Sequence, residues 1–401
     1  MNCKTETSLM AKIILKAGEG KRIKSGHKWV FSNEIKSVEG SPAAGDIVLL
    51  YDNSNAFIAK GFYNPHSLIA FRLLTLADED INIPFWHKRI EGAKLLREKF
   101  YPKENSYRAV FGESDDLTGI IIDKYGDYLC AQFLSAGTDK HKADILTAAT
   151  AVFNPKGIFI RNDARLRQLE NAGLKEENEV FYGEMPNGVM ILENGLKFYA
   201  DIVGGQKTGW FFDQRDNRAK LAAYAKGLKV LDCYCHTGAF GIYAKNAGAK
   251  STVFADSSRQ ALETAEKNYF LNGFKDFNGV EADALEYLQS QEAKAESFDI
   301  VNVDPPGLIK SRKDFNAGFK YYVKVNEAAI GLLKNGGLLA TSSCSHHLDF
   351  KSFTDVIRQA AAKAKKEVLI IEYGFQAKDH PVLSAMAETQ YLNFAIAVIN
   401  K

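Results

Sequence analysis

Four aspartates stand at the ends of short apolar segments in the second half of the chain, spaced 21 to 27 residues apart. In an open α/β sheet, ligands bind in the crevice beyond the carboxyl ends of the strands, so four such carboxylates would line one rim. A single aspartate in this position is commonly no more than the N-cap of the next helix. Four in succession favour a ligand site, and they are Asp232, Asp256, Asp283 and Asp304.

The loop after the first of these segments, residues 232–241, contains two glycines that can open a helix and admit a ligand close to the backbone, Gly238 and Gly241. It is not a Gly-x-Gly-x-x-Gly loop, because Tyr234 and His236 stand where glycines would be. This departure disfavours a pyrophosphate, and with it a nicotinamide-dependent oxidoreductase, since a dinucleotide needs that close approach.

A nucleoside ligand that has no phosphate fits the same acids with less constraint. For S-adenosylmethionine, the carboxypropyl end would lie near the loop, Asp256 would accept from both ribose hydroxyls, and Asp283 would accept from the adenine amine. The pattern of acids therefore fits a nucleoside ligand such as S-adenosylmethionine.

Two more segments at the same rim carry groups that are suited to covalent catalysis. Asp304 is followed by two prolines and Gly307, and consecutive prolines hold the backbone so that the acid is presented rigidly. The fifth apolar segment ends in Ser-Ser-Cys-Ser, which puts the thiol of Cys344 on the same rim. Most cysteines are small buried hydrophobes, and paired prolines are also common in plain loops. Their combination here favours a nucleophile that works with an acid.

This pair of groups predicts methylation of carbon 5 of a pyrimidine. Carbon 5 is a weak nucleophile, and addition of a thiolate to carbon 6 makes it enamine-like, which splits one hard step into two. Cys344 would add to carbon 6, and Asp304 would hydrogen-bond the ring near nitrogen 3 as charge builds up there. A base that the sequence does not identify must then remove the carbon-5 hydrogen. The target base has to leave its stack to reach the thiol.

The elements that position these groups fall into three parts. From Lys229 onward, strand-like and helix-like segments alternate, which predicts a Rossmann-like α/β domain with a doubly wound parallel sheet. Short β-like runs between turns over residues 11–75 are typical of a small β-barrel. Residues 111–199 mix strands with a helix over 140–153, which indicates an α+β domain. The predicted domains are 1–80, 81–198 and 199–401.

Length and composition agree with an ordinary globular protein of several domains. The 401 residues fit two or three domains at roughly 150 residues each. An apolar fraction of 46%, a charged fraction of 25%, and 51 Lys+Arg against 49 Asp+Glu exclude disordered and fibrous classes. No segment could cross a membrane and residues 1–9 contain no secretory apolar run, so we expect a cytoplasmic protein. The five scattered cysteines indicate reduced thiols rather than disulfides or a metal site.

Positive charge is concentrated near the beginning of the chain. Residues 12–36 contain seven Lys or Arg against two Glu, an excess on which a polyanion could dock. Taken alone, such a stretch is more often a solvated surface, and Trp29 and Phe31 within it are expected to be core residues of the barrel. Lys310 and Arg312, just past the two prolines, either contact phosphates of an entering strand or belong to a solvated loop.

Over nearly its whole length the chain resembles the large-subunit ribosomal RNA cytosine methyltransferases, which combine a PUA domain, an α+β middle domain and a class I methyltransferase domain. The most specific likenesses are the Thr-Gly-x-x-x-Asp-Gln-Arg-x-x-Arg stretch and Ser-Cys-Ser. Two departures affect the substrate pocket: Gly307 replaces an expected Lys or Ala, and two histidines follow Ser-Cys-Ser, at His346 and His347. The resembling stretches are residues 25–32, 207–218, 234–240, 304–306, 343–345 and 379–382.

The resemblance implies a fold, a reaction and a set of site residues. The product would be 5-methylcytosine in ribosomal RNA, Cys344 the nucleophile and Asp304 its acid partner. RNA contact becomes the favoured role for the basic residues Lys21, Arg22, Lys24, Lys28, Lys310 and Arg312. The residues expected around S-adenosylmethionine are Asp213, Gln214, Arg215, Asp232, Thr237, Gly238, Asp256, Ser257, Asp283 and Asp304.

Several alternatives stay open beside this interpretation. An RNA methyltransferase that acts on an exocyclic amine of adenine or guanine needs no thiol, and a ribosome assembly factor could keep the fold without catalysis. Arg215 and Arg218 could instead mark a solvated helix start with ion pairs. The sequence identifies neither the modified cytosine nor whether the substrate is free RNA or a subunit, and a homodimer is compatible with it.

Overall fold

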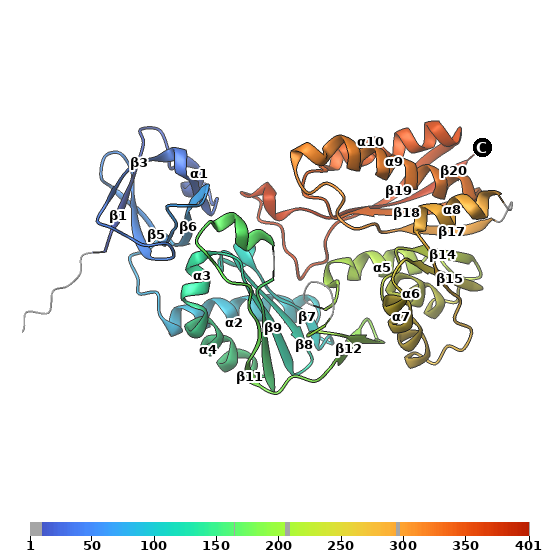
Figure 1. The fold of residues 1–401 in the computed structure, drawn as a ribbon, viewed down its shortest axis with the longest axis horizontal. Coiled ribbons are helices and arrows are strands. Elements are labelled where there is room, and N and C mark those ends of the chain that lie inside the picture. Colours follow the sequence, from blue (N-terminus) through green and yellow to red (C-terminus); the bar gives the residue numbers. More distant parts are fainter. Residues whose placement is uncertain (1–9, 164, 205–208, 294–296, 401) are drawn as a thin grey trace, which may run out of the picture. The chain divides into compact units, whose positions relative to one another are not determined.

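The computed structural model describes residues 10–163, 165–204, 209–293 and 297–400 (Figure 1). Outside these ranges lie Lys207, Thr208 and residues 1–9, which include Cys3 and in which we expect no secretory run. No helix within them is long and apolar enough to cross a membrane. The chain divides into two compact units. The first comprises Met1–Val189, Ala200–Trp210 and Asp379–Thr389, and the second comprises Met190–Tyr199, Phe211–Lys378 and Gln390–Lys401.

The first unit begins with a six-stranded sheet in the order β2-β6-β5-β4-β1-β3, which bears out the predicted β-rich module. Neighbouring strands are antiparallel except β1 and β4, which are parallel. Side chains that alternate along the strands form its core, as Ile13 and Leu15 do. The strands are β1 (Lys12–Leu15), β2 (Trp29–Phe31), β3 (Ile35–Glu39), β4 (Ile47–Tyr51), β5 (Phe57–Tyr63) and β6 (Ile69–Thr75), and a short helix, α1 (Lys21–Lys24), precedes β2.

Strand β2 corrects one expectation about the core of this sheet. Val30 is buried in the core, whereas Trp29 and Phe31 on either side of it are only half-buried. Successive side chains of a strand point to opposite faces, so only one of the two faces of β2 can reach the core. The two aromatics therefore lie outside it. The indole Nε1 of Trp29 donates to Glu113 at 2.9 Å.

A five-stranded sheet in the order β11-β10-β9-β8-β7 follows in the same unit. Strands β8 and β9 form a hairpin, and the predicted helix over 140–153 is observed as two helices that meet at His141. Buried side chains of α2 and α4, such as Trp86 and Ile145, pack on the sheet. The elements are α2 (Ile83–Phe100), β7 (Ser106–Phe111), β8 (Ile120–Tyr125), β9 (Tyr128–Phe133), α3 (Ala136–Lys140), α4 (Lys142–Phe153), β10 (Gly157–Arg161) and β11 (Asn178–Gly183).

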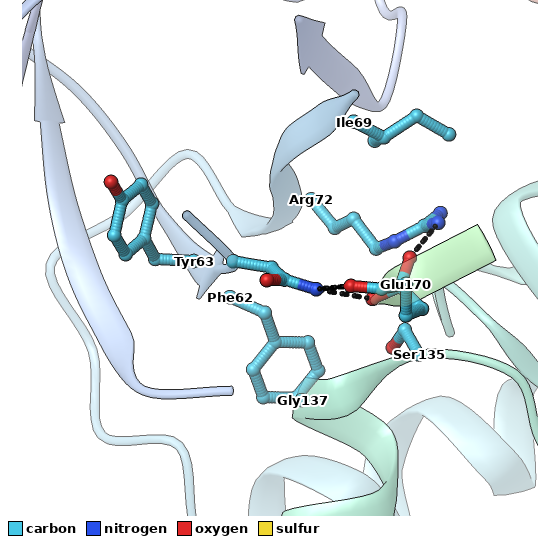
Figure 2. A pocket seen from close by; sticks show the side chains of 8 residues that line it. Phe62, Tyr63, Ile69, Arg72, Ser135, Gly137 and Glu170 are labelled. Carbon is cyan, nitrogen blue, oxygen red and sulfur yellow. Dashed lines mark hydrogen bonds and ion pairs between the residues drawn. The ribbon is translucent and has the colours of Figure 1, made fainter. Parts of the chain in front are cut away.

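A buried ion pair joins strand β6 to the segment that follows β10 (Figure 2). The guanidinium of Arg72 lies 2.9 Å from Oε1 of Glu170, whose other oxygen accepts from the amide of Asn64 and the backbone N–H of Ala136, each at 3.1 Å. Burial raises the pKa of Glu170, but the attraction of Arg72 and these hydrogen bonds outweigh it and leave the pKa below its ordinary value. The carboxylate is therefore charged at neutral pH and holds β6, the segment after β10 and the start of α3 together.

The segment Asp379–Thr389 returns from the second unit to complete the first. The guanidinium of Arg97 donates to the carbonyl oxygen of Asp379 at 2.8 Å, and the backbone N–H of Arg108 donates to its carboxylate at 3.0 Å. His380 is 2% exposed and its Nδ1 lies 2.8 Å from the other carboxylate oxygen of Asp379. The Asp-His-Pro-Val stretch is thus itself anchored in the first unit.

The second unit contains a seven-stranded sheet in the order β16-β15-β14-β17-β18-β20-β19. Strands β14 to β18 run parallel, and β20 is antiparallel to both β18 and β19. The order reverses at β14, so the loops after β14 and β17 flank the crevice where such sheets bind ligands. The strands are β14 (Lys229–Cys233), β15 (Ser251–Asp256), β16 (Gly279–Glu281), β17 (Phe298–Val303), β18 (Leu333–Ser343), β19 (Glu367–Gly374) and β20 (Asn393–Asn400).

Helices cover both faces of this sheet, as expected for the predicted Rossmann-like domain (Figure 1). Leu231 and Val301 belong to a core shared with α8, α9 and α10, whereas their neighbours Val230 and Ile300 belong to a core shared with α5 and α6. Burial on both faces makes the central strands almost continuously apolar. The helices are α5 (Arg215–Ala222), α6 (Ala239–Asn246), α7 (Arg259–Leu271), α8 (Ala284–Ala293), α9 (Phe315–Leu332) and α10 (Phe350–Ala364).

Candidate active site

Cys344 follows β18 directly and is half-buried. The other described cysteines, Cys130, Cys233 and Cys235, are buried reduced thiols, and burial raises the pKa of each above its ordinary value. A thiol must lose its proton to act as a nucleophile. Of the cysteines that the structure describes, Cys344 is therefore the one placed for such chemistry.

The loop after β17 lies against this thiol. A Cβ built on Gly307 would be 3.6 Å from Sγ of Cys344 and 3.9 Å from Oγ of Ser345. Because Gly307 has no side chain, the space next to Sγ is left open at this position. The structure thus brings together the Asp-Pro-Pro-Gly loop and the Ser-Cys-Ser segment, which the sequence assigned to one rim.

The carboxylate of Asp304 is held by two side chains. Oδ1 accepts from the side-chain amide of Gln214 at 3.0 Å and from the hydroxyl of Ser342. The same amide reaches Ser342 at 3.3 Å, and the oxygen of Gln214 accepts from Asn217 at 2.7 Å. Asn217 thereby turns the nitrogen of Gln214 toward Asp304. No local pattern in the sequence marks Ser342 or Asn217 as members of this network.

Asp213, next to Gln214 in the 3₁₀ helix Phe212–Gln214, is anchored to the end of the chain. Its carboxylate accepts from the hydroxyl of Tyr391 at 2.6 Å, and its carbonyl oxygen accepts from the backbone N–H of Ala377 at 2.8 Å. The ring of Tyr391 lies 5.2 Å from that of His346. Tyr391 therefore links the Asp-Gln-Arg stretch to the segment that follows Cys344.

Arg215 lies in a buried ionic cluster at the start of α5. It is fully buried, and its Nε lies 3.5 Å from Oε2 of Glu193, which is also fully buried. The other oxygen of Glu193 accepts from Arg218 at 2.6 Å and from the hydroxyl of Tyr243 at 3.0 Å. The alternative of a solvated helix start is therefore wrong for both arginines.

The loop between β14 and α6 turns sharply. Its backbone takes positive φ angles at Tyr234, His236 and Gly238, of 57°, 49° and 79°, and such angles are uncommon for residues other than glycine. The carboxylate of Asp256 stabilises the turn, since it accepts from the backbone N–H groups of His236 and Ser258, each at 2.9 Å. Asp256 therefore connects this loop to the one after β15.

The two glycines of this loop serve close packing of helix α6. A Cβ on Gly241 would be 2.2 Å from a ring carbon of Phe254 on β15, and one on Gly238 would be 2.9 Å from Cβ of Ala265 on α7. Distances this short are not tolerated between real atoms. The sequence predicts that these glycines admit a ligand, and the structure shows that packing already requires them.

Asp232 lies beneath the loop and is 1% exposed. Its two oxygens accept from the backbone N–H of Gly241 at 2.9 Å and from the side-chain amide of Asn302 at 2.8 Å. Burial raises the pKa of Asp232 to about 7. Asn302, a polar residue inside the apolar strand β17, was a signal that the sequence analysis missed.

The remaining residues predicted around the cofactor lie at the ends of β14, β15 and β16. Asp283 is exposed and caps α8, since its carboxylate accepts from the backbone N–H of Glu286 at 3.0 Å. Ser257 is exposed, and the carbonyl oxygen of Thr237 accepts from Asn268 at 3.1 Å. The half-buried carboxylate of Asp256 and the exposed one of Asp283 can each accept further hydrogen bonds, as the hydroxyls and amine of a nucleoside require.

Three of the basic residues predicted for RNA contact have acidic partners. Arg22 binds Glu34 through two hydrogen bonds of 2.8 and 2.9 Å, Lys24 lies 3.5 Å from Asp52, and Lys28 contacts Asp116. The other three, Lys21 on α1 and Lys310 and Arg312 before α9, are exposed. The local positive charge near the beginning of the chain is therefore partly neutralised, by Glu34 within the stretch and by Asp52 and Asp116 from elsewhere in the first unit.

Comparison with known proteins identifies the family. Residues 13–76 match the PUA-like domain family, and residues 140–368 match the S-adenosylmethionine-dependent methyltransferase family. Ribosomal RNA large subunit methyltransferase I of Vibrio vulnificus is 39% identical over 399 residues, which cover 98% of this chain and 100% of that protein. The protein of the same name from Vibrio cholerae is 40% identical over 395 residues, which cover 96% and 99% of the two chains.

The chain belongs to the ribosomal RNA large subunit methyltransferase I family. As a member of the S-adenosylmethionine-dependent methyltransferases it uses S-adenosylmethionine, which confirms the predicted cofactor. A solved structure from Streptococcus mutans, assigned to the same class, has a TM-score of 0.82 at 21% identity and covers 96% of this chain and 99% of that one. A methyltransferase structure complexed with SAH has a TM-score of 0.84 at 21% identity, with the same coverage. Both confirm the fold of this family member.

Proposed function

We propose that this protein forms 5-methylcytosine in large-subunit ribosomal RNA through a covalent bond between Cys344 and carbon 6 of the base. One observation carries the proposal: the half-buried thiol of Cys344 lies against Gly307, three residues from Asp304, at the carboxyl ends of β18 and β17. The substrate class rests on the names of the relatives from Vibrio, which span nearly the whole chain.

The chemistry requires a nucleophile and an acid on the same side of the sheet. The thiolate of Cys344 would form a bond to carbon 6, and the electrons of the carbon 5–carbon 6 double bond would move toward carbon 5 and the nitrogen 3 side of the ring. Asp304, as the neutral acid, would hydrogen-bond nitrogen 3 and stabilise that charge. Gln214 and Ser342 fix one carboxyl oxygen, so the acid keeps one orientation.

The second half of the reaction restores the aromatic ring. Bound S-adenosylmethionine supplies the methyl group that carbon 5 takes up. A base then removes the hydrogen from carbon 5, the double bond forms again, and the bond between Sγ and carbon 6 breaks to release Cys344. The residue that acts as this base is not assigned.

The cofactor would lie across the carboxyl ends of β14, β15 and β16. Asp256 would accept from the ribose hydroxyls and Asp283 from the adenine amine, while the backbone around Thr237 and Gly238 and the exposed Ser257 border the same space. Asp232 lies beneath the loop between β14 and α6 and would hold that loop in place by accepting from the backbone N–H of Gly241. Asp213, Gln214 and Arg215 would hold the other side of the site, Arg215 through its contact with Glu193.

RNA contact is proposed for the exposed cations first. Lys310 and Arg312 follow the Asp-Pro-Pro-Gly loop, so a strand that delivers a base to Cys344 would pass near them. Lys21 is exposed on α1, whereas Arg22, Lys24 and Lys28 would have to exchange an acidic partner for a phosphate. Binding should weaken as the salt concentration rises, because phosphate contacts release counterions.

The decisive experiment combines labelled S-adenosylmethionine, unmodified ribosomal RNA, and the wild-type or Cys344→Ala protein, followed by identification of the labelled nucleoside. We expect label in 5-methylcytosine with the wild type and none with Cys344→Ala. Cys130→Ala, which removes a buried thiol from the first unit, should retain activity. Label in an adenine or guanine nucleoside, or equal label with both proteins, would contradict the proposal and favour amine methylation.

A second readout tests the covalent bond itself. In RNA that contains 5-fluorocytosine, carbon 5 carries no removable hydrogen after methyl transfer, so the thiol cannot leave and a protein–RNA adduct accumulates. We expect this adduct to resist denaturation, to map to the peptide that contains Cys344, and to be absent with Cys344→Ala. An adduct on another cysteine would transfer the role of nucleophile to that residue.

A further inference from the structure

We propose that Tyr322 is a positioning residue that fixes the Cys344 thiol relative to the loop that carries Asp304. This inference deepens the proposed function and rests on it for the role of the two groups. No local pattern in the sequence marks Tyr322, because the residue lies on α9, more than 20 positions before Cys344. Its hydroxyl lies between the strand end and the loop and hydrogen-bonds to both.

The hydroxyl of Tyr322 is the centre of a buried network. The hydroxyl of Ser343 donates to it at 2.9 Å, the hydroxyl of Ser345 lies 3.0 Å from it, and it donates to the carbonyl oxygen of Pro306 at 3.4 Å. Ser345 in turn accepts from the backbone N–H of Ile309 at 3.2 Å. One phenol group thus joins both neighbours of the nucleophile to both ends of the Pro306–Ile309 turn.

The three consecutive residues Ser343, Cys344 and Ser345 differ in how far their side chains are buried. Ser343 and Ser345 are 0% and 2% exposed, whereas Cys344 between them is half-buried. Side chains at alternate positions of an extended chain point the same way and their middle neighbour points the other way. The two serines are therefore fixed inside the protein, and this fixes the direction in which the thiol projects.

Burial stabilises the hydrogen-bond network around the Tyr322 hydroxyl. Tyr322 is 1% exposed, and burial raises the pKa of its hydroxyl, so it stays protonated and able to donate throughout the working range of pH. A buried hydroxyl that loses its partner is costly, so the network favours one arrangement of loop and strand. The same arrangement sets the backbone of Gly307 against Sγ of Cys344. Release of the loop should therefore expose the thiol and misplace it relative to Asp304.

The variant Tyr322→Phe tests this by removing a single oxygen atom. We expect kcat for RNA methylation to fall roughly tenfold or more, with KM changed by less than about threefold, since misplacement by about 1 Å costs reactivity rather than binding. In the absence of RNA and methyl donor, Cys344 should react with iodoacetamide at least roughly threefold faster than in the wild type, because access limits such a thiol. Mass spectrometry of the Cys344 peptide measures this rate.

A matched control removes a buried hydroxyl elsewhere in the same unit. Tyr269 is 0% exposed and its hydroxyl donates to Asp276 at 2.7 Å, so Tyr269→Phe should leave both kcat and the alkylation rate within about twofold of the wild type. If Tyr322→Phe does not fold, Ser345→Ala replaces it, because that change cuts the link to Ile309 and leaves Tyr322 in place.

Addition of Ser343→Ala to Tyr322→Phe provides a test of coupling. If both side chains act through one network, the double variant should react at the rate of Tyr322→Phe alone. An alkylation rate that is unchanged or slower in Tyr322→Phe, or that changes equally in Tyr269→Phe, would overturn the inference. Because alkylation needs neither RNA nor methyl transfer, it tests the position of the thiol even if the proposed reaction is wrong.

Discussion

The side-chain amide of Gln214 donates to the carboxylate of Asp304 across 3.0 Å, although 90 positions separate the two residues in the chain. Asn217 binds the oxygen of the same amide, and Ser342 donates to the same carboxylate oxygen. A chain of hydrogen bonds therefore runs from the start of α5 to the ends of β17 and β18. The orientation of the proposed acid depends on a helix far from it in sequence.

Loss of this amide should impair catalysis. We expect Gln214→Ala to lower the single-turnover rate of RNA methylation roughly tenfold, because Asp304 would lose one of the two donors that fix its orientation. The matched control is Gln359→Ala, which removes an amide that donates to Asp355 at 2.8 Å on α10. Equal rates for the two variants would show that the contact with Asp304 is without consequence for the reaction.

The open space beside Cys344 should respond to side chains at position 307. A Cβ there lies in ordinary van der Waals contact with Sγ, so Gly307→Ala should fold normally and slow alkylation of Cys344 slightly. The branched side chain of Gly307→Val should slow it roughly tenfold, since it would occupy the direction from which a reagent approaches. Iodoacetamide labelling followed by peptide mapping measures both rates. Identical rates for glycine and valine would place the accessible side of the thiol elsewhere.

Stability should depend on the protonation of Asp232. Burial raises its pKa from 3.8 to about 7, so the folded state binds more protons than the unfolded state between these values. The stability that this group contributes is present in full below about pH 4 and is lost as the pH rises through 7, by ~4 kcal/mol at most. Asp232→Asn does not titrate there, and its Oδ1 can still accept one hydrogen bond.

Urea unfolding at several pH values measures this effect as a difference between two proteins. The free energy of unfolding of the wild type should fall relative to that of Asp232→Asn as the pH is raised from 4 to 7. Other groups titrate equally in both proteins and cancel in the comparison. Parallel pH profiles would mean that Asp232 is ionised in the folded protein throughout this range.

Two glycine substitutions should shift stability in opposite directions. Gly241→Ala would put a Cβ 2.2 Å from the ring of Phe254 and should destabilise the protein by about 2 kcal/mol or more through overpacking. Gly92 in α2 has nothing within 4 Å of the corresponding position, so Gly92→Ala should stabilise the helix by about 0.5–1 kcal/mol. Thermal unfolding of both variants measures the shifts, and a neutral Gly241→Ala would mean that α6 can move away from β15.

Much of the fold could be predicted from local patterns along the chain. Alternation of apolar strands and helices predicted the parallel sheet, and the four acids do lie at the carboxyl ends of its strands. What escaped prediction is the network beneath that rim, because its members come from separate segments. Tyr322 on α9 and Tyr391 near the C-terminus show no local signal of the groups that they bind, and Asn302 is one polar residue in an apolar strand.

Roles of charged residues were the least predictable part. Lys28 and Arg215 belong to stretches that look solvated or ligand-binding, yet Lys28 contacts Asp116 and Arg215 is buried beside Glu193. The acids that partner them are 88 and 22 positions away. A local charge count cannot include such partners, so it overestimates the charge that is left for RNA.

The return of Asp379–Thr389 to the first unit has a consequence for how the protein is made. Neither unit is continuous in sequence, and the first lacks a segment until residue 389 has left the ribosome. Until then, the backbone N–H of Arg108 and the guanidinium of Arg97 lack the acceptor atoms that Asp379 provides. The first unit therefore cannot finish folding before most of the second unit has been made, and a single cut in the chain cannot yield two self-sufficient fragments.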